Sequence, residues 1–212
     1  MRIGLYGGSF DPVHRGHLLV AQAALEEVGL DRLVFIPAAQ SPLKPGTCPA
    51  PGPRRIRWLR MALVGETRCC VDPLELERGG VSYTIDTVRH FQKRYPDARL
   101  FYLIGADNVP QLPQWREVES LVGLVEFVVI PRPGSPSVPL PGEYRLHHLK
   151  GWSTDISSSE IRRRVCRGLP VRHLMPNEVA DDLVKDPPYR DEELHVGASP
   201  RDMRNPMVTG PG

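Results

Sequence analysis

Residues 4–29 read GLYGGSFDPVHRGHLLVAQAALEEVG, and they join a short apolar run to an amphipathic segment through a loop rich in glycine and histidine. The apolar run 2–7 predicts a buried strand, and the spacing of apolar residues in 17–28 predicts a helix closed by a glycine. Gly7 and Gly8 close the strand, where the lack of a side chain lets a ligand approach the backbone. A tight strand-to-helix turn also accounts for a glycine pair.

Apolar runs and helical patterns alternate along the rest of the chain. Further strands are expected at 32–37, 69–76 (kinked by Pro73), 99–105 and 125–131. Further helices are expected at 53–66, burying Ile56, Leu59 and Leu63, and at 82–96, burying Ile85, Val88 and Phe91. This alternation predicts an α/β fold with a doubly wound, Rossmann-like parallel sheet. In such sheets ligands bind beyond the carboxyl ends of the strands, where most of the unusual segments of this chain lie.

Length and composition favour one globular domain. We expect that domain at 1–189, with a small helical part at 156–186, and a flexible tail at 190–212 that is rich in proline, glycine and charge. The formal net charge of +2 gives no electrostatic case for binding nucleic acid or a membrane. The sequence has no secretory signal and no long apolar run, and its 4 cysteines fit no zinc pattern. We therefore expect a cytoplasmic protein with reduced thiols.

Two histidines follow the glycine pair. His14 and His17 are three residues apart at the start of a helix, so they share a face and point at the same volume, and Gly16 removes bulk between them. The unpaired N–H groups of that first turn favour an anion. A metal site and an ordinary polar surface pair are the alternatives, but no third ligand at suitable spacing supports a metal. Two imidazoles aimed at phosphate is the interpretation we favour.

A second segment, DISSSEIRRRV (155–165), indicates the same chemistry. Ser157 and Glu160 form a capping box, which explains one serine as an ordinary helix cap. The donors beyond that cap are Ser158, Ser159 and Arg162. The arginine lies one turn into the helix, where its planar fork can reach a phosphate held at the N-terminus. Lys44, in the proline-flanked SPLKP, would add a positive charge from a loop.

The two segments together resemble the signatures of the nucleotidylyltransferase superfamily. GGSFDPVHRGH (7–17) matches G-x-F-D-P-x-H-x-G-H, and ISSSEIR (156–162) matches I-S-S-x-x-I-R. Three further stretches are similar to bacterial nicotinate-nucleotide adenylyltransferases: GGVSYTIDT (79–87), LIGADNVPQLPQW (103–115) and RPG (132–134). The resemblance runs from about residue 2 to residue 189. It departs at IPAAQSPLK, where Ala38, Ala39 and Leu43 replace the family's Asn and Pro-Pro-His, so part of the mononucleotide contact set is expected to differ.

The resemblance implies transfer of the adenylyl group of ATP to nicotinate mononucleotide, with Mg²⁺ carried by the ATP phosphates and no metal ligands from the protein. The catalytic residues it implies are His14, His17, Lys44 and Arg162. For ATP it implies Gly8, Ser9, Phe10, the two histidines, Asp107, Ser157, Ser158, Ser159 and Arg162. For the mononucleotide it implies Lys44, Tyr83, Thr84, Trp115 and Arg132. Because the attacking phosphate has a second pKa of about 6, no general base is needed and the histidines act as donors.

Some of these roles have plain alternatives. Asp107 is placed to accept from a ribose hydroxyl, with an N-cap or a turn former as the alternative. Trp115 can stack on a pyridine ring or simply pack half-buried. Arg132 is expected to contact a phosphate or the adenine. The rival functions are another enzyme of the superfamily, such as the pantetheine-phosphate adenylyltransferase, and a non-catalytic nucleotide sensor. The stretches at 82–87 and 103–115 disfavour the first, and the intact phosphate-binding residues disfavour the second.

Overall fold

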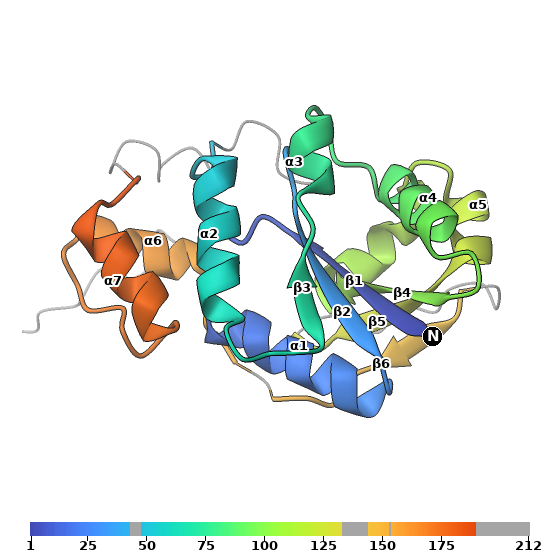
Figure 1. Cartoon of the computed structure of the whole chain (residues 1–212), viewed down its shortest axis with the longest axis horizontal. Helices are drawn as coiled ribbons and strands as arrows, with labels where there is room; N and C mark the ends of the chain where they lie inside the picture. Colours follow the sequence, from blue (N-terminus) through green and yellow to red (C-terminus); the bar gives the residue numbers. More distant parts are fainter. Residues whose placement is uncertain (43–47, 133–143, 153, 190–212) are drawn as a thin grey trace, which may run out of the picture.

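The computed structural model describes residues 1–42, 48–132, 144–152 and 154–189, and its centre is a six-stranded sheet in which every neighbouring pair is parallel (Figure 1). The strands are β1 (Arg2–Gly8), β2 (Arg32–Pro37), β3 (Cys69–Val71), β4 (Arg99–Gly105), β5 (Val125–Ile130) and β6 (Leu146–His148). Their order is β3-β2-β1-β4-β5-β6, so the direction of winding reverses between β1 and β4. The predicted doubly wound, Rossmann-like fold is confirmed, with its switch point at the carboxyl ends of β1 and β4.

Helices cover both faces of the sheet because successive side chains of each strand point to opposite sides. Tyr6 and Leu103 pack with α1 (Arg15–Glu27) and α2 (Gly52–Ala62). Leu5 and Tyr102 pack on the other face, with α4 (Thr84–Arg94), the 3₁₀ helix η1 (Ala106–Gln114) and α5 (Val118–Leu124). The predicted inward face of α4 is confirmed, since Ile85, Val88 and Phe91 are buried.

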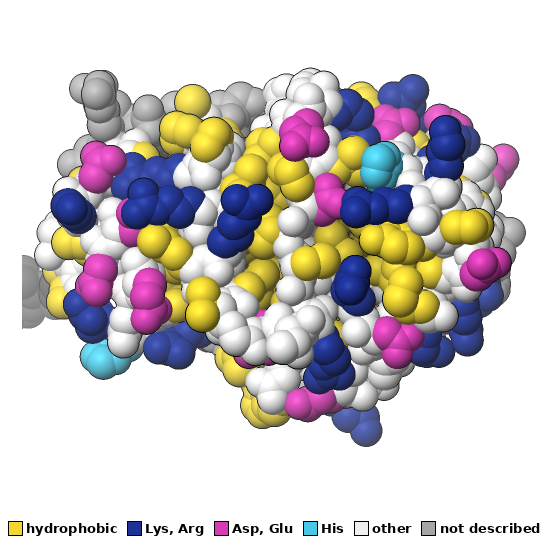
Figure 2. Space-filling view, in the orientation of Figure 1, with side chains coloured by type: hydrophobic (Ala, Val, Ile, Leu, Met, Phe, Trp, Pro, Cys, Tyr) yellow, Lys and Arg dark blue, Asp and Glu magenta, His cyan; other side chains and the backbone are white. Residues whose placement is uncertain are grey.

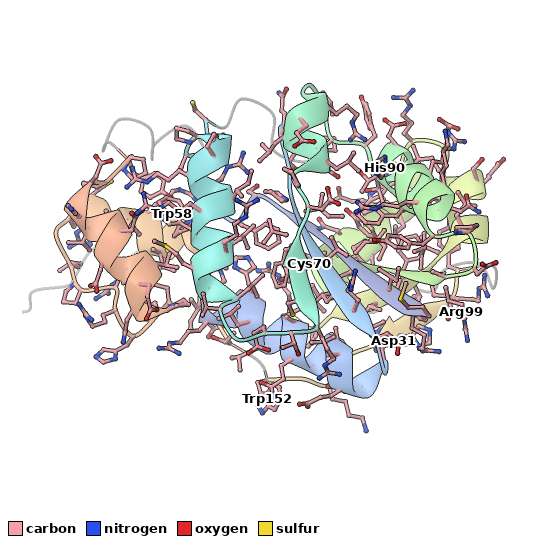
Figure 3. The ribbon with its side chains drawn as sticks, in the orientation of Figure 1. Asp31, Trp58, Cys70, His90, Arg99 and Trp152 are labelled. Carbon is pink, nitrogen blue, oxygen red and sulfur yellow. The ribbon has the colours of Figure 1, made fainter. Side chains whose placement is uncertain are left out.

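Two C-terminal helices, α6 (Ser158–Cys166) and α7 (Asn177–Lys185), lie beside α2 (Figure 1). Trp58, labelled in Figure 3, projects from α2 and donates from its indole Nε1 to Asp182 on α7 at 2.7 Å. Arg57 on α2 pairs with the same carboxylate at 2.7 Å. The helical part expected at 156–186 is therefore attached to the sheet through α2, whereas the tail expected at 190–212 lies outside the described residues.

Several boundaries differ from the predictions. The strand expected at 69–76 ends at Val71, because the Asp72 side chain accepts from the Leu74 N–H at 3.0 Å and a short helix, α3 (Leu74–Arg78), begins there. The first helix begins at Arg15 rather than at residue 17. In α2, Ile56 is only partly buried, and Arg55 and Trp58 occupy the buried face with Leu59. The edge strand β6 was not predicted, because three residues form too short a pattern.

The surface carries mixed charge on the face drawn in Figure 2, where Lys and Arg side chains alternate with Asp and Glu rather than forming one basic area. Among the described residues, no helix is long and apolar enough to cross a membrane.

Candidate functional site

A cleft of about 1570 Å³ lies at the switch point, where the carboxyl ends of β1 and β4 meet the first turns of α1, α4 and α6. Every predicted site residue that the structure describes lines it: Gly8, Ser9, Phe10, His14, His17, Tyr83, Thr84, Asp107, Trp115, Arg132, Ser157, Ser158, Ser159 and Arg162. Lys44 and Leu43 lie outside the described residues. Segments separated by up to about 150 positions in the sequence thus converge on one cavity.

The two histidines form a stacked pair at the start of α1. Their ring centroids are 3.8 Å apart with an interplanar angle of 29°. His14 is the N-cap residue, and its backbone N–H donates to Nδ1 of His17 at 3.2 Å. Because Nδ1 of His17 accepts, the proton of the neutral ring is on Nε2. The prediction that both imidazoles share one face is confirmed.

His14 is kept neutral by its surroundings. Burial, together with the smaller effect of the positive charge of Arg132, lowers the pKa of its imidazole from 6.5 to about 4. Its Nδ1 is buried and, among the described residues, has no hydrogen-bond partner. The His14 side chain faces the backbone N–H of His17 in a capping box, so this buried atom lies against the first turn of α1.

The loop between the glycines and α1 is shaped by aromatic packing. Phe10 has a φ of 46°, in the left-handed region that non-glycine residues rarely adopt. Its buried ring packs edge-on against Tyr6 and His17, at centroid distances of 5.3 and 5.0 Å. A Cβ at Gly8 would lie 3.0 Å from this ring. Glycine at this position therefore makes room for Phe10, a packing reason that adds to the expected one of ligand approach.

Arg55 and Asp11 are buried residues that hold the same loop in place, and neither was predicted as a site residue from the sequence. Arg55 is 2% exposed, and its guanidinium donates to the carbonyls of Ser9, Ala38 and Ala50 at 2.8, 2.9 and 2.8 Å. Burial lowers its pKa, while the nearby carboxylate of Asp11 raises it. One buried cation thus joins the loops after β1 and β2 to the segment before α2. The sequence feature that could have indicated this role is an arginine one helical turn before Leu59, on the buried face of α2.

The carboxylate of Asp11 is 5% exposed and joins the loop to the C-terminal segment. Its Oδ1 accepts from the Ala50 N–H at 3.1 Å and from the Tyr189 hydroxyl at 2.8 Å. Burial raises the pKa of Tyr189, so its hydroxyl stays protonated and remains a donor. The guanidinium of Arg162 lies 5.9 Å from the Tyr189 ring centroid. The buried phenol therefore positions both the loop and the arginine beside it.

The start of α6 lies against the loop that precedes the histidines and lines the same cleft. The hydroxyl oxygen of Ser157 accepts from the Glu160 N–H at 3.2 Å, so the predicted cap is confirmed. Ser158 donates to the Pro12 carbonyl at 2.9 Å. Arg162 donates to the Asp11 carbonyl at 2.8 Å and to the Ser159 hydroxyl at 3.2 Å. The guanidinium has five N–H groups, so it retains donors for a ligand while it ties α6 to the first loop.

The opposite end of the cleft is aromatic. Trp115 meets Tyr102 and Phe127 edge-on at centroid distances of 6.0 and 6.5 Å, and its buried Nε1 has no partner among the described residues. Tyr83 is the N-cap of α4, and Thr84 is its first residue. A hydrogen bond from the Thr84 side chain reaches the buried Tyr102 phenol, whose pKa is raised by burial. A flat, apolar wall therefore stands beside a helix N-terminus.

Asp107 and Arg132 line the same cleft. Nε of Arg132 is 3.6 Å from Oδ1 of Asp107, and both side chains are about half exposed. Gly105, which ends β4, leaves the space they need, because a Cβ there would lie 2.4 Å from Oδ1 of Asp107. Asp107 is in the first turn of η1. This position is compatible with either expected role, forming the turn or binding a ribose hydroxyl.

No group of three or more His, Cys, Asp or Glu residues suited to a metal ion occurs in the described part of the chain. The cleft instead presents donors from both histidines, the serines of α6 and five arginines: Arg116, Arg132, Arg162, Arg163 and Arg167. Such an arrangement is suited to binding a polyanion by hydrogen bonds and positive charge, with an aromatic site at one end.

Comparisons with known proteins agree with this chemistry. The cytidylyltransferase-like family model matches residues 5–164. A protein of Opitutus terrae named probable nicotinate-nucleotide adenylyltransferase is 47% identical over 84% of this chain and 92% of its own length. A protein of the same name in Gemmatimonas aurantiaca is 43% identical over 90% and 93%. The Plasmodium falciparum nicotinic acid mononucleotide adenylyltransferase complexed with NaAD has the same fold, with a TM-score of 0.71, 17% identity and coverage of 87% and 95%.

Proposed function

The chain belongs to the cytidylyltransferase-like family and, within it, to the nicotinate-nucleotide adenylyltransferases, and from this membership and its cleft we propose that it adenylates nicotinate mononucleotide. In the reaction a phosphate oxygen of the mononucleotide attacks the α-phosphorus of ATP. The bond from that phosphorus to the oxygen bridging to the β-phosphate breaks, so deamido-NAD and pyrophosphate form. The observation that carries the proposal is the stacked histidine pair, with His14 neutral, lining one cleft together with the donors of α6.

The histidines act in this proposal as hydrogen-bond donors to the α-phosphate. The pKa of His14, lowered to about 4, and the fixed Nδ1 acceptor of His17 argue against proton uptake as their main role. No base is needed, because the attacking phosphate is mostly ionised at neutral pH. Catalysis then consists of positioning two polyanions and stabilising the charge that develops in the transition state.

The donors of α6 serve the departing pyrophosphate. We assign to the β- and γ-phosphates the side chains of Ser157, Ser158, Ser159, Arg162 and Lys44. We assign to ATP as well the backbone of Gly8, Ser9 and Phe10. ATP enters with its own divalent ion, and we assign that ion as Mg²⁺ held by the phosphates and water. Asp107 is assigned to a ribose hydroxyl and Arg132 to a phosphate.

The aromatic end is assigned to the mononucleotide. The pyridine ring would stack on Trp115, and its 3-substituent would meet the start of α4 at Tyr83 and Thr84. The N–H of Tyr83 donates to the Val81 carbonyl at 3.2 Å, whereas the N–H groups of the first turn, from Thr84 on, have no partners within the helix. A carboxylate gains there from the helix dipole, and charge-assisted bonds are about twice as strong as neutral ones. We therefore propose that the acid is preferred over the amide.

A pyrophosphate-release assay tests the proposal directly. The substrates offered with MgATP are nicotinate mononucleotide, nicotinamide mononucleotide, phosphopantetheine and glycerol phosphate. We expect turnover with the pyridine mononucleotides, the acid first, and none with the other two. Strong activity with phosphopantetheine would overturn the assignment, and calorimetric binding of ATP without any pyrophosphate release would indicate a nucleotide sensor instead.

A further inference from the structure

Arg116 has a position in the cleft that none of the roles above uses. It follows Trp115 directly and lines the same cavity. Its guanidinium carbon lies 4.7 Å from the ring centroid of Tyr83, the N-cap residue of α4. The cation is thus held over the residue that begins the helix whose N-terminus faces the pyridine end.

The donors of Arg116 are largely unused. Among the described residues its guanidinium makes no hydrogen bond, and its nearest carboxylate is Glu117, with Nε and Oε1 3.8 Å apart. Glu117 is engaged elsewhere, because its Oε2 accepts from Arg89 at 2.6 Å, and this bond lowers the pKa of the carboxyl. The positive charge of Arg116 is therefore only weakly balanced by protein groups.

A buried carboxylate, that of Glu75, also lines the cleft and affects how an anionic substrate group would bind. Glu75 is 3% exposed, lines the cleft, and accepts from the Thr87 hydroxyl at 2.6 Å. A negative group here opposes binding of an anionic ring substituent. The N–H groups of α4 account for only part of a preference for the acid, since the carbonyl oxygen of an amide also accepts from them. A further positive charge would strengthen the discrimination.

We propose that Arg116 is a specificity-determining residue that favours a carboxylate over a carboxamide on the pyridine ring. This inference rests on the proposed function of the cleft. The guanidinium has only donors, so it attracts both oxygens of a carboxylate, whereas it offers nothing to the amide NH₂ group. Stacking on Tyr83 keeps its plane oriented although the side chain is 52% exposed, which reduces the conformational entropy lost on binding.

The experiment compares kcat/KM for nicotinate and nicotinamide mononucleotide in the wild-type protein, Arg116→Gln, Arg116→Lys and Arg94→Gln. Arg94 is the matched control, because it also lies over a tyrosine, 5.4 Å from the Tyr95 ring centroid, and is 53% exposed, but it is at the other end of α4 and outside the cleft. Thermal unfolding checks that each variant is folded.

We expect Arg116→Gln to lower the acid-to-amide ratio by about tenfold, as a single charged contact of this exposure would. The change should appear mainly in KM, because the ring substituent is bound alike in ground and transition states. Arg116→Lys should keep most of the ratio and Arg94→Gln all of it. Raising the ionic strength should lower the wild-type ratio and leave that of Arg116→Gln nearly constant.

Other outcomes contradict the inference. An unchanged ratio in Arg116→Gln overturns it, as does an equal loss for both substrates, which would assign the guanidinium to the shared phosphate. An equal fall of the ratio in Arg94→Gln would reduce the effect to general surface charge and also overturn it. Failure of the proposed function looks different, since the wild-type protein would then release no pyrophosphate with either mononucleotide.

Discussion

The backbone N–H of His14 donates to Nδ1 of His17 at 3.2 Å, so the first histidine of the pair determines the tautomer of the second. Nε2 of His17 then carries the proton of the neutral ring and can donate to a phosphate oxygen. The stacked ring of His14 fixes the plane of that donor, with centroids 3.8 Å apart. A donor held in place before substrate binds is the arrangement that stabilises a developing charge most effectively.

Replacing His17 by alanine should therefore reduce kcat by about 10²–10³-fold, the cost of removing one such donor. The KM for the mononucleotide should change less, because the bond strengthens in the transition state. The control is His90→Ala, a histidine that is labelled in Figure 3 on α4 and does not line the cleft. A kcat near that of the wild-type protein would show that His17 does not serve the reaction.

The titration of His14 should be displaced to low pH. Its folded-state pKa of about 4 lies below the ordinary 6.5 because of burial, so the unfolded chain binds more protons between these values. The contribution of His14 to the free energy of unfolding is therefore fully present above pH 6.5. It decreases by up to about 3 kcal/mol as the pH falls through about 4.

Histidine NMR resonances followed from pH 3 to 8 in the free protein measure this directly. Arg132→Gln should raise the midpoint of His14 only partly, because the arginine is the smaller of the two causes. A His14 midpoint near 6.5 in the wild-type protein would contradict the buried, neutral state.

Gly7→Ala should destabilise the fold by about 1–3 kcal/mol, the usual cost of overpacking a core. The new Cβ would lie 2.5 Å from the hydroxyl oxygen of Tyr102, a buried side chain that has little room to move. Tyr102→Phe removes that oxygen, so Gly7→Ala should cost much less in its background. Urea denaturation of the four proteins gives the coupling energy, and additive effects would place the clash elsewhere.

Trp115→Ala should raise KM for both pyridine mononucleotides by similar factors, of about tenfold or more, because ring stacking does not distinguish the 3-substituent. Stability should also fall, since the indole packs against Tyr102 and Phe127. Trp115→Phe keeps a stacking surface and should recover much of both losses. A selective loss of one mononucleotide would assign the discrimination to the indole rather than to its neighbours.

Local patterns accounted for most of the fold and for two groups of residues that line the cleft. The histidine pair and the serines of α6 could be predicted because each set lies within one helical turn, where spacing alone determines which side chains share a face. Alternating apolar runs likewise predicted five of the six strands, and only β6, with three residues, was too short to give a pattern.

Long-range partners could not be predicted in the same way. The buried role of Arg55 depends on carbonyls of Ser9 and Ala38, which the sheet brings to it from 46 and 17 residues away. Ile56 was expected on the buried face of its helix, but the helix is rotated so that Arg55 and Trp58 face inward, where carbonyls of Ser9 and Ala38 and the carboxylate of Asp182 accept from them. Arg116 was missed for the same reason, since it lies between η1 and α5 and its partner Tyr83 is the N-cap residue of α4.

The hydrogen bond from Tyr189 to Asp11 spans 178 residues, and it sets an order of events during synthesis. During synthesis the loop with the two histidines is made first and the strands of the sheet follow. Until Tyr189 is added, the carboxylate of Asp11 lacks the hydrogen bond from its hydroxyl. Contacts between such distant residues form late, because the long loop they close must be ordered first. The loop with the two histidines is therefore fully held only after Tyr189 has been made, and shorter chains carry the same motif without the hydrogen bond from Tyr189 to Asp11.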